Sequence, residues 1–164
     1  MKSKLRTLCL ICIALLASTG AYANSSLYNL SFPNVDSEDI QLSEYKGKVI
    51  LLNFWATWCP PCVKEMPSIQ RLHDKFPEQD FEILAINAGE SQATVKRFMM
   101  GLDTELTFPI LLDETGRTFK EFGIRGLPMS FLFDREGKLI ETISGSREWD
   151  EESEVQLIRS AISH

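Results

Sequence analysis

The chain has 164 residues, four cysteines and a formal net charge of −6 at pH 7. Without residues 1–23, which hold three basic residues and no acidic residue, the net charge becomes −9. This acidity argues against nucleic acid as a partner, because Lys and Arg contacts to phosphate supply most of that affinity. The chain shows no repeat, low-complexity tract or long linker, so we expect residues 24–164 to form one domain.

Residues 1–23 have the pattern of a secretory signal peptide. Basic residues within 2–6 precede a short apolar run over 8–17, and a small-residue cleavage site ends at Ala23. The apolar run is shorter than the roughly 20 residues of a membrane-spanning helix, but an uncleaved anchor remains the alternative. We therefore predict a periplasmic protein in an oxidising compartment, which keeps only Cys59 and Cys62 after cleavage.

The rest of the chain alternates strand patterns with helix patterns. A short N-terminal hairpin is expected from Leu30 to Leu42. Strands are then expected over 49–55, 81–87, 108–112, 129–133 and 139–143, and helical segments over 63–76, 91–99, 118–122 and 150–162. Strands that alternate with helices predict an α/β fold with parallel strands at its centre. The hairpin near the C-terminus adds antiparallel strands, so the predicted sheet is mixed and flanked by helices.

The segment Trp58-Cys59-Pro60-Pro61-Cys62 lies where a buried strand pattern meets a helix pattern. Closing so short a loop stabilises a fold little, so the pair is better suited to redox cycling than to holding the fold together. The helix N-terminus favours a thiolate at Cys59, which we assign as the exposed nucleophile. Cys62, one turn further on, is the resolving thiol. The two prolines remove N–H donors from the first turn.

Other uses of the two cysteines fit less well. A zinc site needs further ligands, and residues 24–164 hold no other cysteine and only two histidines. Covalent haem attachment needs a histidine after the second cysteine, where the chain has Val63. We therefore expect no metal and no cofactor other than the redox-active Cys59–Cys62 disulfide. An inert structural disulfide stays open as an alternative.

Three features together resemble the thioredoxin superfamily, and most closely its exported TlpA/ResA-like thiol-disulfide oxidoreductases. They are the run Asn53 to Cys62, Pro67 in the following helix, and Gly126-Leu127-Pro128 before a strand. The resemblance implies a thioredoxin-like fold with an N-terminal extension. It also implies that Pro128 is a cis-proline that holds the Leu127 backbone beside the cysteines for an incoming chain.

The resemblance also bears on proton transfer. Cytoplasmic-type thioredoxins carry a buried Asp at the position of Asn53, and an amide cannot titrate. Glu65 is similar to a glutamate that lies near the disulfide in ResA-like proteins, where it could exchange a proton with Cys62. The alternative is a solvated glutamate on the helix face. The acidic run from Glu148 to Glu154 is interpreted as a helix start with a solvated face.

We expect Trp58, Pro60 and Pro61, together with Leu127 and Pro128, to contact a client protein. The family resemblance favours a reductase of specific client disulfides, of the cytochrome c maturation or metal-site assembly type. Its electrons would come from a membrane thiol-disulfide donor, and the protein would be a monomer. A DsbA-type oxidant and a non-catalytic binding or metallochaperone module are the alternatives. A peroxiredoxin-like peroxidase is disfavoured because its reactive cysteine lies in a different local pattern.

Overall fold

The computed structural model describes residues 27–76 and 80–163, and the predicted signal peptide lies outside them. Five strands form the central sheet in the order β5-β4-β3-β6-β7. They are β3 (Val49–Trp55), β4 (Phe81–Ala88), β5 (Ile110–Asp113), β6 (Met129–Phe133) and β7 (Leu139–Ser144). The strands β3, β4 and β5 are parallel, and β6 and β7 are antiparallel to their neighbours. The predicted mixed α/β sheet is confirmed.

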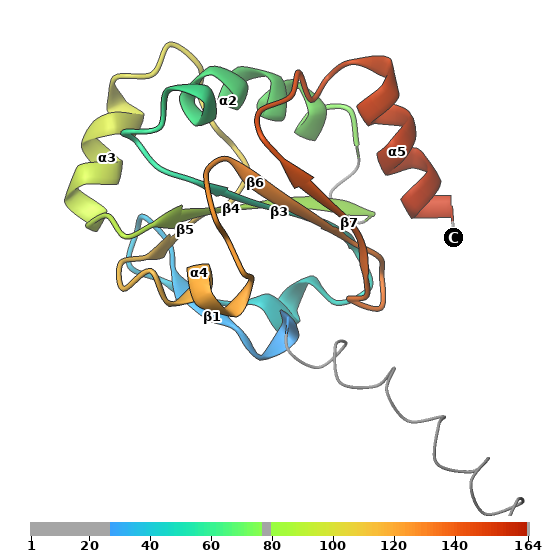
Figure 1. Cartoon of the computed structure of the whole chain (residues 1–164), viewed down its shortest axis with the longest axis horizontal. Helices are drawn as coiled ribbons and strands as arrows, with labels where there is room; N and C mark the ends of the chain where they lie inside the picture. The colour runs from blue at the N-terminus through green and yellow to red at the C-terminus, as the bar shows by residue number, and fades with distance from the viewer. Residues whose placement is uncertain (1–26, 77–79, 164) are drawn as a thin grey trace, which may run out of the picture.

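Helices cover both faces of this sheet (Figure 1). On one face lie α2 (Pro60–His73), α3 (Gln92–Met100) and α5 (Glu152–Ser163). The short helix α4 (Arg117–Glu121) lies on the other face, together with the N-terminal segment. That segment holds the 3-10 turns η1 (Leu27–Asn29) and η2 (Leu42–Tyr45) and the antiparallel pair β1 (Ser31–Pro33) and β2 (Asp39–Gln41).

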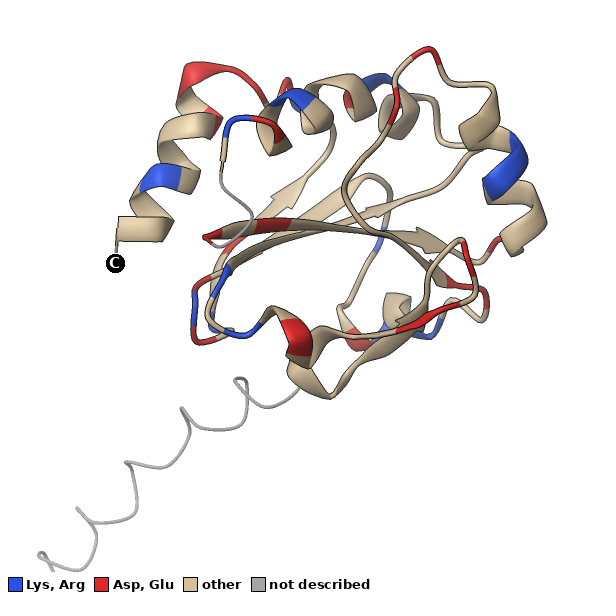
Figure 2. Ribbon diagram, turned by 180° about the vertical axis from the view of Figure 1, so that it is seen from behind, with Lys and Arg blue, Asp and Glu red and all other residues tan. Residues whose placement is uncertain are grey.

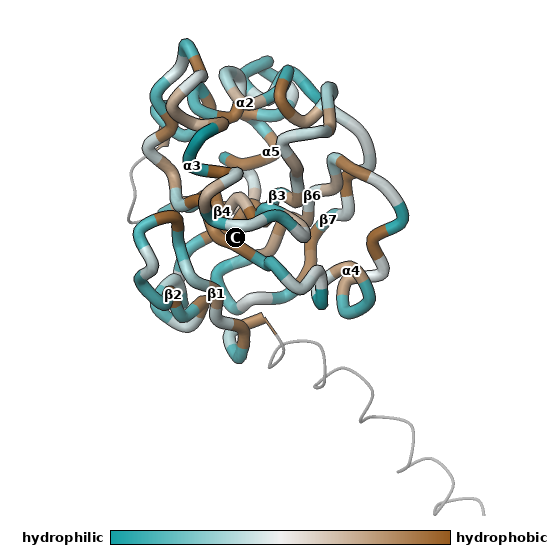
Figure 3. The backbone as a smooth tube through the Cα atoms, turned by 90° about the vertical axis from the view of Figure 1, so that its left-hand side faces the viewer, coloured by the Kyte–Doolittle hydropathy of each residue, from teal (hydrophilic) through white to brown (hydrophobic). Residues whose placement is uncertain are grey.

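The strand β3 is the middle strand of the sheet, and all of its seven residues are buried. Its side chains alternate between two apolar clusters, as expected for a strand with period two. Val49, Leu51 and Trp55 join the cluster beneath α2, α3 and α5, whereas Ile50, Leu52 and Phe54 join the cluster that packs against the N-terminal segment. Figure 3 shows the resulting concentration of apolar residues along the strands and the inner faces of the helices.

The structure corrects several predicted boundaries. Helix α2 starts at Pro60, so the two prolines lie in its first turn as predicted, whereas the apolar period had shown the helix only from Val63. The helix ends at His73 and not at Phe76. Leu42 lies in η2 and not in the hairpin strand. Helix α5 starts at Glu152 and not at Asp150. The hairpin itself is confirmed, with Phe32 paired to Ile40.

Charged residues lie mainly on the helices and loops outside the sheet. Figure 2 shows acidic residues around the start of α5, next to the turn that leads into it. Across residues 27–76 and 80–163, none of the helices combines the length and the apolar character that a membrane crossing requires.

Candidate redox active site

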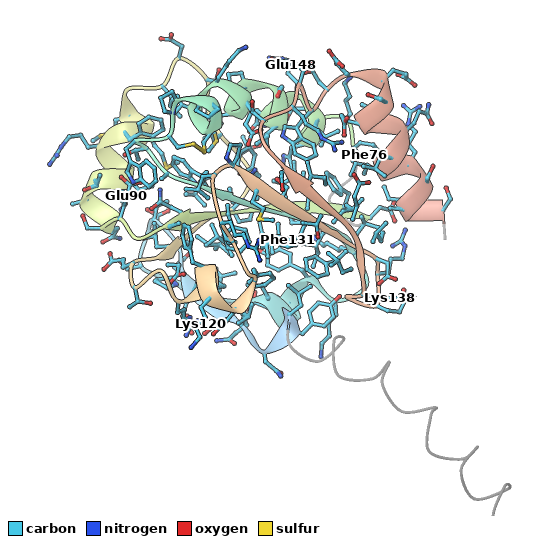
Figure 4. The ribbon with its side chains drawn as sticks, in the orientation of Figure 1. Phe76, Glu90, Lys120, Phe131, Lys138 and Glu148 are labelled. Atoms are coloured by element: carbon cyan, nitrogen blue, oxygen red, sulfur yellow. A yellow bond between two sulfur atoms is a disulfide. The ribbon has the colours of Figure 1, made fainter. Side chains whose placement is uncertain are left out.

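The two cysteines lie where the chain leaves the carboxyl end of β3 and enters α2. They form a disulfide with an S–S distance of 2.08 Å and a Cα–Cα distance of 5.3 Å. Figure 4 shows the side chains of this region as sticks, with the sulfur atoms in yellow. The predicted partners Cys59 and Cys62 are thus joined as a short-range pair.

Cys59 is the N-cap residue of α2, and its sulfur accepts the backbone N–H of Cys62 at 3.4 Å. Pro60 and Pro61 occupy the first two helical positions and have no N–H to offer. The sulfur of Cys59 therefore meets one N–H of the helix start, together with the positive end of the helix dipole.

The predicted exposure of Cys59 is wrong for the oxidised protein, in which this residue is buried. Its exposed fraction is 4 % and that of Cys62 is 0 % in the oxidised protein. Both cysteines belong to the apolar cluster under α2, which covers most of the Cys59 surface. Cys59 remains the more accessible of the two sulfur-bearing residues, as its assignment as the attacking thiol requires.

Three residues next to the disulfide are available to a partner. Trp58 is 66 % exposed, and both Pro60 and Pro61 are exposed. A large exposed indole is a suitable contact site, because a partner could bury most of its apolar area.

A groove lies at the same end of the sheet. The Leu127–Pro128 peptide bond is cis, as predicted, and it directly precedes β6. Because β6 is antiparallel to β3, with Met129 opposite Phe54, its start lies at the end of β3 that leads to the cysteines. The groove has a volume of about 510 Å³ and is lined by Gly123, Arg125, Gly126, Leu127, Pro128, Met129, Ser144 and Gly145.

Glu65 is buried, with 2 % of its surface exposed, so the interpretation as a solvated helix-face residue is wrong. Its Oε1 accepts Asn53 Nδ2 at 3.0 Å, and its Oε2 accepts Trp149 Nε1 at 3.1 Å and the backbone N–H of Arg147 at 3.2 Å. Burial raises the pKa of Glu65 above its usual range, and the charge of Glu148 raises it further, although the three hydrogen bonds oppose the rise.

Glu65 shares a helix face with the resolving cysteine. Residues three apart on an α-helix are neighbours on its surface, so Glu65 lies one turn after Cys62. Both residues are buried, with exposed fractions of 0 % for Cys62 and 2 % for Glu65. A carboxylate with a raised pKa in such a place is suited to proton exchange with a thiol.

Asn53 takes part in this network although it cannot titrate. Its amide is fully buried in β3 and donates to both Glu65 Oε1 and Ser130 Oγ, the latter at 2.9 Å. Within the described residues, its carbonyl oxygen Oδ1 has no hydrogen-bond partner. The sequence predicted that Asn53 is not an acid–base group, but it did not indicate that Asn53 would bond to Glu65.

The loop between β7 and α5 supplies the remaining partners of Glu65. Trp149 is fully buried within the acidic run that was interpreted as a solvated face, so that interpretation is wrong at this residue. Its backbone N–H also donates to Ser68 Oγ at 3.0 Å. A single large aromatic among charged residues is the sequence signal that could have indicated a buried anchor here.

A second carboxylate holds the segment just before the disulfide. Glu90 accepts the backbone N–H of Thr57 at 2.7 Å, the Thr57 hydroxyl at 2.5 Å and Asn87 Nδ2 at 2.8 Å. Glu90 follows β4 and lies near the start of α3, where Figure 4 labels it. These bonds fix the chain next to Trp58, and no local sequence pattern predicts them.

Comparison with known proteins agrees with this arrangement. The sequence model that defines the AhpC/TSA family matches residues 24–142. Thiol-disulfide oxidoreductase ResA of Bacillus thuringiensis is 41% identical over 119 residues, which are 73% of this chain and 68% of that protein. ResA of Halalkalibacterium halodurans is 38% identical over 125 residues, 76% of this chain and 70% of that protein.

Two solved structures share the fold. Bacillus subtilis StoA superposes with a TM-score of 0.64 and 30% identity, covering 80% of this chain and 94% of StoA. The exposed lipoprotein thioredoxin of Streptococcus pneumoniae superposes with a TM-score of 0.69 and 29% identity, covering 80% of this chain and 98% of its own. The sheet, the disulfide at the start of α2 and these matches agree: the chain belongs to the AhpC/TSA family and is a thioredoxin-like thiol-disulfide oxidoreductase of the ResA type.

Proposed function

We propose that this oxidoreductase reduces disulfides in specific client proteins. The observation that carries the proposal is the Cys59–Cys62 pair at the start of α2 with the buried carboxyl group of Glu65 one turn away. The connection from β4 to β5 supports reduction over DsbA-type oxidation, because it contains α3 alone and no large helical insertion.

The proposed reaction starts from the dithiol form. The Cys59 thiolate attacks one sulfur of the client disulfide; the client S–S bond breaks and a mixed disulfide forms. Cys62 gives its proton to the Glu65 carboxylate, and the Cys62 thiolate then attacks the Cys59 sulfur. The products are the Cys59–Cys62 disulfide and a client dithiol, which has gained two electrons and two protons, one through Glu65 and one from water.

The surroundings of the disulfide support contact with a folded or partly folded client. Trp58 offers an exposed apolar surface, and the groove offers the Leu127 backbone just before β6, since the Pro128 carbonyl already accepts the Gly145 N–H. An incoming chain in extended conformation could bond to such backbone groups, as in other cases of strand addition. We propose that the client lies across these two features.

Replacing Cys62 with Ser tests which of the two cysteines attacks the client disulfide. In the Cys62→Ser protein the mixed disulfide cannot be resolved, so client adducts held by Cys59 should accumulate in the exported fraction. The Cys59→Ser protein is the matched control and should trap none. Adducts that form through Cys62 in the Cys59→Ser protein would contradict the assignment of the nucleophile.

The reduction potential separates reductase from oxidant. A value near or below about −270 mV, as in thioredoxin, agrees with the proposal, and one near about −120 mV, as in DsbA, would show that the chain is an oxidant. A protein whose pair undergoes no exchange with small thiols would instead be a binding module. A membrane thiol-disulfide protein is the proposed electron donor, and no further cofactor is needed for this cycle.

Glu65→Gln tests the proton step. The amide keeps the shape of the side chain but cannot take up a proton, so the pH dependence of thiol reactivity should lose the contribution of Glu65 while the protein stays folded. An unchanged thiol titration would remove Glu65 from the mechanism.

We also propose that the protein works in the periplasm as a monomer, with residues 24–164 as its one domain. The order of basic, apolar and small residues in 1–23 supports export. The mass of the protein in the periplasmic fraction should correspond to cleavage after Ala23. Full-length protein held in the membrane fraction would identify the segment as an anchor.

A further inference from the structure

Trp149 is the buried residue of the loop between β7 and α5, and it makes two of the hydrogen bonds that join this loop to α2. Trp149 donates its indole N–H to Glu65 Oε2 at 3.1 Å and its backbone N–H to Ser68 Oγ at 3.0 Å. Glu65 and Ser68 are three residues apart, so both lie on one face of the helix. Both N–H groups of Trp149 are therefore bonded to the same buried face of α2, and its side chain is fully buried.

The two oxygens of Glu65 have different surroundings. Oε2 accepts two N–H groups, from Trp149 and from the backbone of Arg147, whereas Oε1 accepts only Asn53 Nδ2. A proton on Oε2 would point toward N–H donors that cannot accept it. The acid form therefore places its proton on Oε1, next to the Asn53 amide.

Asn53 can serve both forms of the neighbouring carboxyl group. Its NH₂ group now bonds to Glu65 Oε1 and Ser130 Oγ, and its Oδ1 is buried without a partner among the described residues. If the amide turns over, Oδ1 can accept the acid O–H of Glu65 and the hydroxyl of Ser130. The amide thus has one orientation that matches the carboxylate and one that matches the acid.

We propose that Trp149 is a positioning residue of the redox site: its indole N–H reserves Oε2 of Glu65, so that the proton is taken up and released at Oε1. The inference rests on the proton role of Glu65 proposed above. It identifies a specific contribution of the β7–α5 loop, which also begins beside the groove at Ser144 and Gly145.

Few charges within the described residues face this carboxyl group. Glu148 in the same loop is its acidic neighbour, and it opposes ionisation of Glu65. The guanidinium of Arg147 bonds to Glu154 at 2.8 Å and lies 3.5 Å from Glu141, so its charge points elsewhere. From the sheet, the neutral side chains of Asn53 and Ser130 form the network next to Glu65. On α2, the titratable neighbour is Cys62, three residues before Glu65.

The experiment replaces Trp149 with Phe in the whole protein and follows the Glu65 carboxyl carbon by NMR. The Glu65→Gln spectrum assigns the signal, and titrations are run on oxidised and reduced protein. Trp149→Phe removes one hydrogen bond to the carboxylate, so the midpoint of the Glu65 titration should rise by about one pH unit relative to wild type.

Trp55→Phe is the matched control. Trp55 is also fully buried, and among the described residues its indole N–H has no acceptor. The same deletion of a ring and an N–H should leave the Glu65 midpoint unchanged. A Trp149→Phe midpoint equal to that of wild type, or equal shifts in both variants, would overturn the proposal.

A measurement on wild-type protein covers the case in which Trp149→Phe does not fold. The indole N–H signal of Trp149 should move with the midpoint of Glu65, and that of Trp55 should not. If the chemical shift of the Trp149 indole N–H stays constant while Glu65 titrates, the proposal is overturned. Failure of the proton role is a separate result: Glu65→Gln would leave thiol reactivity unchanged while Trp149→Phe still shifted the Glu65 midpoint.

Discussion

Asn53→Asp places a second carboxyl group against Glu65 inside the protein. The Asn53 Nδ2 atom lies 3.0 Å from Glu65 Oε1, and the two side chains are 0 % and 2 % exposed. Two negative charges at this distance repel each other by about 5–6 kcal/mol at an effective dielectric constant of about 20. The pair therefore keeps one proton through neutral pH, and the upper pKa belongs to the pair as a whole.

The sign of the effect on stability follows from the retained proton. The folded protein holds a proton that the unfolded chain releases near pH 4, so stability is present at low pH and is lost as pH rises through the folded-state pKa. Above the pH at which wild-type Glu65 ionises, the free energy of unfolding of Asn53→Asp should fall behind wild type by about 1.4 kcal/mol per pH unit. The gap should level off at about 5 kcal/mol, the repulsion estimated above.

Urea unfolding of the oxidised proteins at intervals from pH 5 to pH 9 measures this gap. The double variant Asn53→Asp with Glu65→Gln is the control, because it holds a single carboxyl group and the widening with pH should disappear. A gap of the same size at pH 6 and at pH 9 would refute the reasoning, since it would show that the two carboxyl groups do not share a proton.

Two further predictions concern the stability of the protein. Gly137→Ala should lower the free energy of unfolding by about 2–3 kcal/mol, because Gly137 has a φ of +77° and a Cβ there would lie 2.5 Å from the Tyr28 ring. Urea unfolding would measure this loss. In the double variant with Tyr28→Ala, the part of the loss that comes from the clash with the ring should disappear. Thr57→Val should cost about 1 kcal/mol, because Glu90 loses the hydroxyl but keeps the backbone N–H of Thr57. A loss above about 3 kcal/mol for Thr57→Val would mean that the hydroxyl also supports the backbone bond.

The strands and the reactive pair could be predicted because their signals are local. The apolar run at 49–55 has the length and composition of a buried strand, and the Cys-x-x-Cys spacing places both thiols in one helical turn. The 3-10 turn Leu42–Tyr45 was missed because four residues are too few to show a period.

The surroundings of Glu65 could not be predicted, because its partners are distant in sequence. Asn53 is 12 residues away, and Arg147 and Trp149 are 82 and 84 residues away. Periodicity indicates which face of a helix is apolar, but it does not show that a polar group on that face will meet three donors. Only the packing of the β7–α5 loop on α2 brings them together.

The N-terminal segment before β3 completes the core of the described domain. Leu27, Phe32 and Leu42 are at most 1 % exposed and fill the face of the sheet opposite the redox site. Removal of all three would cost about 5–9 kcal/mol at about 1.5–3 kcal/mol for each buried side chain. Typical domains are stable by only about 5–15 kcal/mol. A shortened protein that begins at β3 would keep every reactive residue but would lack most of the free energy that keeps it folded.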